Sequence, residues 1–425
     1  MFCLFGWTPM IKEPRLTLFD LVICLSDAAD LVCPALVNHH KQVAYIASCI
    51  GAEMGLDEET QKDLVLAGAV HDIGALSLNE RIETLAFEEN PFSGHAEVGY
   101  SLLQLFKPLE RVAKIVKWHH RRFDENVEET FTLESHIIHL ADRVAVLIDG
   151  KREILGQVSG IEDKILGQRG KMFRPDVTDA FFAAARKEYF WLDAVSSSVY
   201  RILRRTTRMK TLTLDIGQLR ELSVFFSRII DFRSSFTATH SAGVAATAET
   251  LAGLARFSKR EREYMRIAGL LHDLGKLAVP REILEKPGRL EKTEFDVIRG
   301  HTYHTYRILD TLEDFDEINT WGAFHHEKLN GNGYPFHHSG EVLSLGSRIM
   351  GVADIFTAII EDRPYRAGMT PDAVSGVLSS MVKSGSIDGD IVRLLQNNLT
   401  EVNGNRQLAQ AESRQMYSEI IGTRT

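Results

Sequence analysis

The chain has 425 residues, of which 44% are hydrophobic and 25% charged, an ordinary globular composition with enough length for two hydrophobic cores. The formal net charge of −9 argues against a general surface for duplex nucleic acid, although a few well-placed cations can still hold a small anionic ligand. No apolar run is long enough to span a bilayer, and the four cysteines form no C-x-x-C pair, so we expect a cytoplasmic protein with free thiols and no membrane association.

The first half of the chain shows apolar residues at helical spacing and almost no alternation of period two. We expect helices over 16–32, 43–54, 57–69, from 95 onward, 112–120 and 135–148. Histidine and aspartate mark their ends: His39-His40 precede the second helix, His71-Asp72 follow the third, and His119-His120 close the fifth. The pattern therefore predicts an all-α domain whose polar residues gather at helix ends.

Further helices are predicted over 173–210, and the same pattern then returns in the second half. The expected helices begin at His240, run over 261–271 into His272-Asp273, cover 294–309 around His301, run from 318 to His325-His326, and cover 345–360 around Asp354. Two loops separate them, one over 280–292 and a glycine-rich one over 330–335. From 370 onward we expect a helical region that ends in a polar tail after about Asn403.

The two halves place the same residue types in register. The separation is 32 residues both for His39–His71 and for His240–His272, and 24 residues both for His95–His119 and for His301–His325. The offset between the halves is 201 at the first two positions, 206 at the middle pair and 212 between Asp142 and Asp354. Insertions in the two loops of the second half explain these increases, so the chain carries an internal duplication.

Each half offers the series His, His-Asp, His, His-His and Asp. In the second half these residues are His240, His272, Asp273, His301, His325, His326 and Asp354. The set exceeds what one tetrahedral ion needs and suits two divalent ions bridged by a carboxylate, for which Asp273 is the natural candidate. Two ions a few ångströms apart can activate a bridging hydroxide and neutralise a phosphate under attack. Any one of these histidines alone would more often be structural, but seven residues repeated in register make coincidence a poor explanation.

With these residues in place, and with Gly333-Tyr334-Pro335 in the glycine-rich loop, the second half resembles the HD-GYP domain. This is the branch of the HD phosphohydrolase superfamily that hydrolyses cyclic dinucleotides in bacteria. The matching segments are HDLGK (272–276), HHEKLNGNGYP (325–335) and VADIFTAIIEDRPYR (352–366). The first half is similar to a degenerate copy of the same domain.

The resemblance implies an all-α fold of two tandem helical HD-type domains. Residues 1–200 would form the degenerate domain with a regulatory or dimerising role, 201–219 a helical linker, and 220–425 the catalytic HD-GYP domain. A homodimer is left open, and a structural relic is the competing interpretation of the first domain. Its ligand types are retained, so metal binding there is left open too, but Ala75 stands where the second domain has Lys276, and the GYP loop is missing. We therefore expect no hydrolysis in the first domain.

The resemblance also implies the roles of the second set of residues. One metal would be held by His240, His272, Asp273 and Asp354, and the other by Asp273, His301, His325 and His326, with iron or manganese as the usual ions. Members with a third metal use a Glu where this chain has Phe236, so we expect a dinuclear site. Asp273 and Lys276 would be catalytic, with Lys276, Arg363 and Arg366 on the substrate phosphates and Gly333, Tyr334 and Pro335 forming a wall of the pocket.

The predicted activity is that of a metal-dependent phosphodiesterase acting on a 3′–5′ cyclic dinucleotide. The candidate substrates are cyclic di-GMP and 3′3′-cGAMP, cleaved to a linear dinucleotide and then, as an open possibility, to mononucleotides. One departure matters: Thr357 stands where the family has Asp, which puts in doubt a general acid at this position. The alternatives are a non-catalytic signalling module that binds a cyclic dinucleotide or a protein partner, and an HD phosphohydrolase acting on another nucleotide or on a phosphomonoester.

Overall fold

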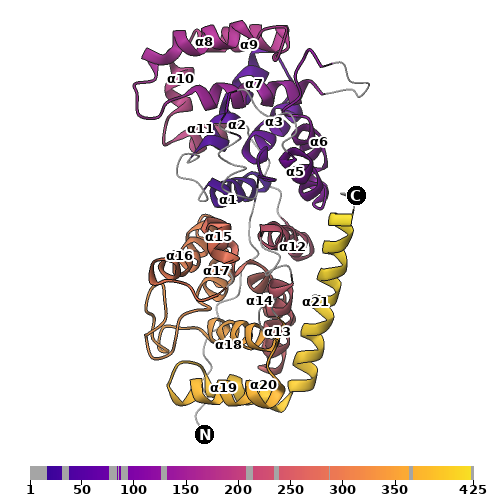
Figure 1. Ribbon diagram of the computed structural model, residues 1–425, viewed down its shortest axis with the longest axis vertical. Coiled ribbons are helices and arrows are strands. Elements are labelled where there is room, and N and C mark those ends of the chain that lie inside the picture. The colour runs from indigo at the N-terminus through magenta and orange to yellow at the C-terminus, as the bar shows by residue number, and fades with distance from the viewer. Residues whose placement is uncertain are drawn as a thin grey trace.

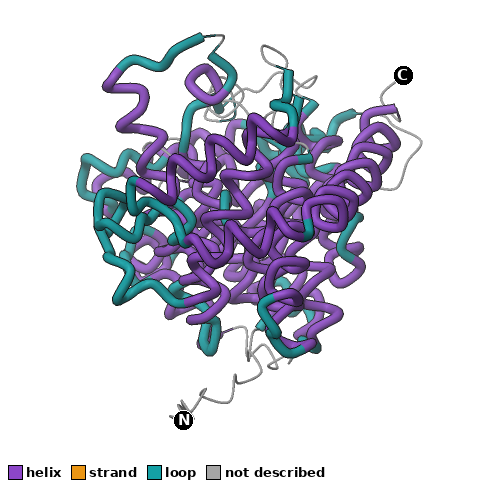
Figure 2. The backbone as a smooth tube through the Cα atoms, turned by 90° about the horizontal axis from the view of Figure 1, so that it is seen from below, coloured by secondary structure: helices purple, strands orange, loops and turns teal. Residues whose placement is uncertain are grey.

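A computed structural model of the chain describes residues 17–30, 38–75, 84, 86–87, 94–125, 132–206, 214–233, 239–286, 288–362 and 367–422. Within these ranges the structure consists of helices and connecting loops, with two isolated β-bridges and no strand, which confirms the predicted all-α fold (Figure 2). None of the described helices is long and apolar enough to cross a membrane.

The helices form two groups that follow one another along the long axis of the molecule (Figure 1). The first group contains α1 (Leu18–Asp30), α2 (His39–Glu53), α3 (Glu58–Val70), α5 (His95–Leu103), η2 (Lys107–Leu109), α6 (Glu110–Lys117), α7 (Leu133–Leu147), η3 (Leu155–Gln157), α8 (Val158–Gly167), α9 (Pro175–Ala185), α10 (Glu188–Ala194) and α11 (Val199–Thr206).

The second group contains α12 (Ile216–Arg233), α13 (His240–Leu254), α14 (Lys259–Leu271), η4 (Leu274–Ala278), α15 (Arg281–Leu284), α16 (Lys292–Leu309), α17 (Asp316–Ala323), α18 (Leu345–Ile360), α19 (Pro371–Lys383), α20 (Gly389–Asn397) and α21 (Leu399–Gly422). Its core pairs are α13 with α14, α18 and α21, which repeats the packing of α2 with α3 and α7 in the first group. The duplication seen in the sequence is therefore a duplication of helix packing.

Two glycines in each group allow the close contacts that bring the polar residues together. A Cβ on Gly68 or Gly269 would lie 2.6 Å from the Cα of Ala44 or Ala245, so only glycine lets the two long helices of each group cross this closely. A Cβ on Gly74 or Gly275 would lie 2.0 or 1.9 Å from the carbonyl oxygen of His95 or His301. In each group the turn after the His-Asp pair thus rests directly on the helix that carries the next histidine.

The observed elements refine several predicted boundaries. The second helix begins at His39 rather than after His40. The pair His119-His120 lies in the turn that follows α6, and the pair His325-His326 lies in the turn that follows α17, rather than inside those helices. The loop expected over 280–292 contains the short helix α15. The polar tail expected after Asn403 is wrong, because α21 continues without a break from Leu399 to Gly422.

The helix α1 connects the two groups. It packs against α2 and α3 of the first group and against η4 and α16 of the second, and the Cys24 thiol lies 3.5 Å from the carbonyl oxygen of Ile308 in α16. The residues Phe19, Leu21, Ile23 and Leu25 are all buried, so α1 is apolar nearly all round, as a helix between two cores should be. The helix α12 makes a second connection, since it packs against both α5 and α14.

Candidate functional site

The His-Asp pair of the second domain lies at the end of a well-terminated helix. Ser258 and Glu261 form a reciprocal capping box at the start of α14, and the helix ends at Leu271, directly before His272. The ring Nδ1 of His272 lies 2.7 Å from the carbonyl oxygen of Gly269, an acceptor only, so Nδ1 carries the proton and Nε2 keeps its lone pair. The helix end therefore presents an imidazole oriented as a metal ligand.

The structure brings the first predicted group of ligands together. The Nε2 atom of His240 lies 3.1 Å from Oδ1 of Asp354, and Nε2 of His272 lies 3.1 Å from Oδ2 of Asp273 and 3.9 Å from the same Asp354 oxygen. His240, His272 and Asp273 offer ligand atoms that all lie within 4.8 Å of one another. These residues come from α13, the turn after α14, and α18, so three helices converge here.

The second predicted group lies on the other side of Asp273. Its Oδ1 atom is 3.3 Å from Nε2 of His301 and 4.0 Å from Nε2 of His325, while Oδ2 faces His272. The donor atoms of His301, His325 and His326 lie within 4.8 Å of one another, and Nδ1 of His326 is 3.9 Å from Oδ2 of Asp354. Because its two oxygens point into different groups, Asp273 has the placement that a bridging carboxylate needs.

The buried donor atoms fit divalent ions. The Nε2 atom of His272 and Oδ1 of Asp273 are both buried and make no hydrogen bond within the protein, an arrangement that is costly unless an ion completes it. The donors are imidazole nitrogens and carboxylate oxygens, which suit borderline divalent metals such as iron, manganese or zinc.

Burial and neighbouring charges set the protonation states of these ligands in the ion-free protein. Burial raises the pKa of Asp354, but the hydrogen bond from His240 and the charges of His325 and His326 hold this pKa well below its usual range. Burial lowers the pKa of His301 to about 3, so this ring is neutral. Burial also lowers the pKa of His240, but Glu361 and Asp354 outweigh it and raise this pKa to about 10.

Glu361 is a part of the site that sequence reasoning missed. Its Oε1 lies 3.0 Å from Nδ1 of His240, and its Oε2 accepts a hydrogen bond of 3.1 Å from Gln410 in α21. A carboxylate on the far nitrogen of a ligating histidine fixes the ring and raises its basicity. The available signal was spacing, because Glu361 follows Asp354 by seven residues, two helical turns along α18.

Lys276 lies at the predicted place, 20% exposed, with its ammonium 2.5 Å from Oδ2 of Asp273. This lysine thus compensates the charge of the buried carboxylate. Arg363 and Arg366, the other predicted phosphate-binding residues, lie outside the described residues, as does Phe236.

The glycine-rich loop carries an aromatic ring to the site. The centre of the Tyr334 ring lies 4.9 Å from the centre of the His326 ring. The Arg299 guanidinium lies over the Tyr334 ring, 5.1 Å from its centre. A Cβ on Gly333 would lie 2.4 Å from the Cα of Glu327, so the loop passes too close for any other residue. Gly333, Tyr334 and Pro335 therefore lie beside the second group of ligands.

Glu327 holds this loop and was also missed. It is 7% exposed, and its two carboxylate oxygens accept hydrogen bonds from the backbone of Phe336 at 2.7 Å and His338 at 3.0 Å.

The side chain of Thr357 is fully buried, with its hydroxyl 3.4 Å from that of Thr247. Thr357 thus belongs to the packing between α13 and α18.

Comparison with protein-family models finds two HD domains in the chain. One HD-domain model matches residues 36–147 and a second matches 225–391. The two matched segments contain the two repeated sets of histidines and aspartates.

Curated relatives match to different extents. The chain is 28% identical over 415 residues to 3′3′-cGAMP-specific phosphodiesterase 1 of Vibrio cholerae, covering 94% of this chain and 95% of that protein. It is 33% identical to 3′3′-cGAMP-specific phosphodiesterase 3 of the same organism, over 51% of this chain and 47% of that protein. It is 34% identical to the cyclic di-GMP phosphodiesterase response regulator RpfG of Xanthomonas campestris, over 37% of this chain and 43% of that protein.

A solved structure is similar over nearly the whole chain. The crystal structure of a cyclic GMP-AMP specific phosphodiesterase of V. cholerae, V-cGAP3, superposes with a TM-score of 0.64 at 23% identity, covering 90% of this chain and 98% of that one. At this identity the likeness shows that the two chains share the tandem all-α fold.

Proposed function

Since the chain belongs to the HD-domain family and carries two HD domains in tandem, we propose that it is a metal-dependent phosphodiesterase that cleaves a cyclic dinucleotide in its second domain. One observation carries the proposal: Asp273 lies between two groups of ligating side chains, with Lys276 beside it at the edge of the site. This arrangement can hold two divalent ions and a phosphodiester together.

The two ions would be held as expected from the sequence, one by His240, His272, Asp273 and Asp354 and the other by Asp273, His301, His325 and His326. When bound, such ions supply a nucleophile at neutral pH and stabilise the charge that develops on the phosphate. Their identity, iron or manganese, is part of the proposal.

The protein supplies orientation and charge around the scissile phosphate. Lys276, 20% exposed, can turn from Asp273 toward a phosphate oxygen once the carboxylate is occupied by metal. Tyr334 offers a ring face beside His326, on which a nucleobase can stack. Glu361 and Glu327 position His240 and the glycine-rich loop without touching the substrate. Arg363 and Arg366 remain proposed phosphate contacts.

We favour 3′3′-cGAMP over cyclic di-GMP as the substrate. The 3′3′-cGAMP-specific relative matches both halves of the chain, over 94% of its length, whereas the cyclic di-GMP relative matches only 37%. The expected product is the linear dinucleotide. The first domain is proposed to be regulatory or dimerising, since Ala75 replaces the lysine there.

A side-by-side assay tests this function. Purified protein, loaded with manganese or with iron under reducing conditions, should cleave 3′3′-cGAMP with a higher kcat/KM than cyclic di-GMP or cyclic di-AMP, with the product identified by mass spectrometry. The double variant His272→Ala, Asp273→Ala should lose all measurable turnover, whereas the control His304→Ala, a half-buried histidine of α16 outside the ligand set, should retain it. A metal-loaded protein that binds the dinucleotide but never cleaves it would overturn the proposal in favour of a non-catalytic binding module.

A further inference from the structure

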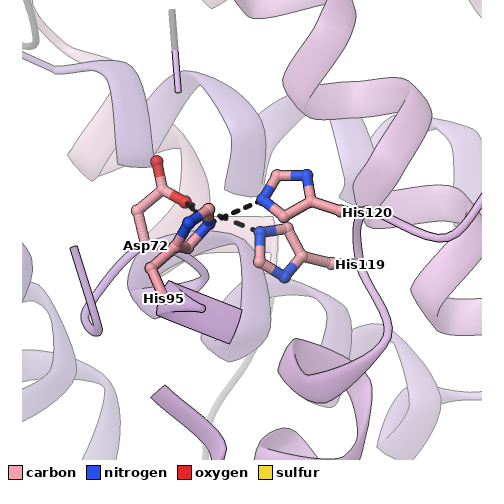
Figure 3. A group of neighbouring side chains, drawn as sticks. All are labelled: Asp72, His95, His119 and His120. Atoms are coloured by element: carbon pink, nitrogen blue, oxygen red, sulfur yellow. Dashed lines mark hydrogen bonds and ion pairs between the residues drawn. The ribbon is translucent and has the colours of Figure 1, made fainter. Parts of the chain in front are cut away.

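The first domain contains a second cluster of ligating side chains. Asp72, His95, His119 and His120 converge on one point (Figure 3), and their ligand atoms all lie within 4.8 Å of one another. Oδ1 of Asp72 is 3.2 Å from Nε2 of His95 and 3.5 Å from Nε2 of His119, and the Nε2 atoms of His95 and His120 are 2.6 Å apart. Asp72, His95 and His119 are each at most 3% exposed.

His119 is oriented as a ligand rather than as an ordinary core residue. Its Nδ1 lies 2.6 Å from the carbonyl oxygen of Val116. This contact fixes the proton on Nδ1 and turns the Nε2 lone pair into the cluster, as the carbonyl of Gly322 does for His325 in the second domain.

Buried atoms in the cluster lack hydrogen bonds. Nε2 of His119 and Oδ1 of Asp72 are buried and have no hydrogen-bond partner within the protein, although they face each other. Leaving such atoms uncompensated costs about 1–3 kcal/mol each, so their convergence indicates an ion.

The cation that accompanies the cluster differs between the domains. In the first domain the fully buried Arg143 guanidinium lies 2.5 Å from Oδ2 of Asp142, the residue that corresponds to Asp354. Arg143 also donates to the backbone carbonyls of Thr84, at 2.9 Å, and Ala86, which fixes it in place. In the second domain the residue after Asp354 is Ile355, and a described cation, Lys276, lies instead on Asp273, the proposed bridging residue.

We propose that the first domain binds one divalent ion through Asp72, His95, His119 and His120, and that the Arg143 guanidinium takes the place of a second ion at Asp142. The charges support a single ion. Asp72 and Asp142 carry two negative charges and Arg143 returns one positive charge, so one divalent ion leaves a net charge of +1 and a second would leave +3 in a buried cluster. The second domain can hold more positive charge, because an anionic substrate enters it beside the 31% exposed His326.

The donor set favours an ion of the zinc class. Three imidazole nitrogens and one carboxylate oxygen match the four ligands of a tetrahedral structural site, whose donor atoms lie about 3.3–3.4 Å apart. The Asp72–His95 and Asp72–His119 separations of 3.2 and 3.5 Å fit this value. The His95–His120 pair has to open by about 0.8 Å. The ion would tie the turn after α3 to α5 and to the turn after α6, and it would have no catalytic role.

Crystals of the full wild-type chain grown with zinc test this directly. An anomalous-difference map at the zinc edge should show one peak in the first domain, enclosed by Asp72 and the three histidines, in addition to any peaks in the second domain. The absence of this peak would overturn the proposal, and two peaks in the first domain would overturn the role given to Arg143. Missing peaks in the second domain alone would count against the proposed enzyme function instead.

A solution measurement with matched variants provides a second test. The double variant His95→Ala, His119→Ala should bind one zinc ion per chain fewer than the wild type, as measured by elemental analysis after gel filtration. The control His136→Gln changes a buried histidine of the same domain outside the ligand group and should bind the wild-type amount. A double variant that keeps the full wild-type zinc content would refute the site, and if this variant fails to fold, the anomalous map of the wild type decides.

Discussion

Lys276 and Arg143 place a fixed positive charge on different carboxylates of two repeated clusters. Lys276 lies on Asp273, the residue between the two ligand groups, at the open edge of the second domain. Arg143 lies on Asp142, away from the bridging position, and is fully buried. Lys276 is 20% exposed and is therefore placed where it could reach a bound substrate, whereas the buried Arg143 can only compensate its neighbours.

Replacing Lys276 by methionine should remove the charge while keeping the length of the side chain. We expect kcat/KM for the dinucleotide to fall about 10–100-fold, since a charge-assisted contact to a phosphate contributes roughly 1.5–3 kcal/mol. Metal content should remain at the wild-type value. The control Lys286→Met removes a lysine that pairs with Glu294 on the surface, and it should leave turnover unchanged. Wild-type kcat/KM in Lys276→Met would exclude Lys276 from substrate binding.

At the residue scale, spacing alone identified the side chains that come together. The seven proposed ligands were found because identical residue types recur at fixed separations in both halves, and the structure brings all seven into one region. Glu361 and Glu327 lie within the matching segments but were missed for a physical reason: neither belongs to the repeated series of His and Asp, and each acts by supporting other protein groups. Glu361 supports one histidine and Glu327 holds one loop, contacts that become visible only after the helices are packed.

At the scale of elements, periodicity located most of the helices but failed at the C-terminus. The helix α21 buries Val402, Arg406 and Gln410, which are four residues apart and mostly polar. A hydrophobic pattern cannot detect such a stripe, because its buried members are satisfied by hydrogen bonds rather than by apolar contact. Arg406 donates to Gln410, and Gln410 donates to Glu361, so the segment predicted as a tail reaches His240, a proposed metal ligand, through Gln410 and Glu361.

The variant Gln410→Leu should therefore weaken metal binding at His240. Without the amide, Glu361 loses the hydrogen bond that holds it on the ring, and we expect metal affinity to fall about 10–100-fold, as for other carboxylates behind a ligating histidine. Manganese titration of the metal-free protein measures this, and excess manganese should restore activity. Gln407→Leu, an exposed position on the same helix, serves as the control. Equal manganese affinity in the two variants would show that α21 only packs against α13.

For the whole molecule, the two domains meet through α1, which belongs to the first domain in sequence and contacts the element that carries Lys276. The helix packs against η4 and α16 of the second domain and against α3, which ends at the first His-Asp pair. A displacement of α1 is thus expected to move both clusters. Composition and periodicity predicted the helix itself but not its partners, because α1 is apolar nearly all round and the sequence does not say which core each apolar face enters.

Cys24→Phe tests this connection, because the larger ring would push α1 away from Ile308. Overpacking of this kind costs about 1–3 kcal/mol. We expect a lower melting temperature together with a lower kcat/KM for the dinucleotide at 20–25 °C, well below the transition. Cys49→Phe makes the same change in α2, beside Tyr45 and away from the second domain, and should lower the melting temperature alone. If both variants leave kcat/KM unchanged, α1 does not influence the second domain.

The contact between Lys276 and Asp273 has a consequence for the order of binding. The Lys276 ammonium lies 2.5 Å from Oδ2 of Asp273, an oxygen that is also a proposed metal ligand. If Asp273 holds metal and Lys276 holds a substrate phosphate, as proposed, the lysine has to exchange a protein carboxylate for a phosphate of the substrate. Substrate binding would then depend on metal binding through this one side chain.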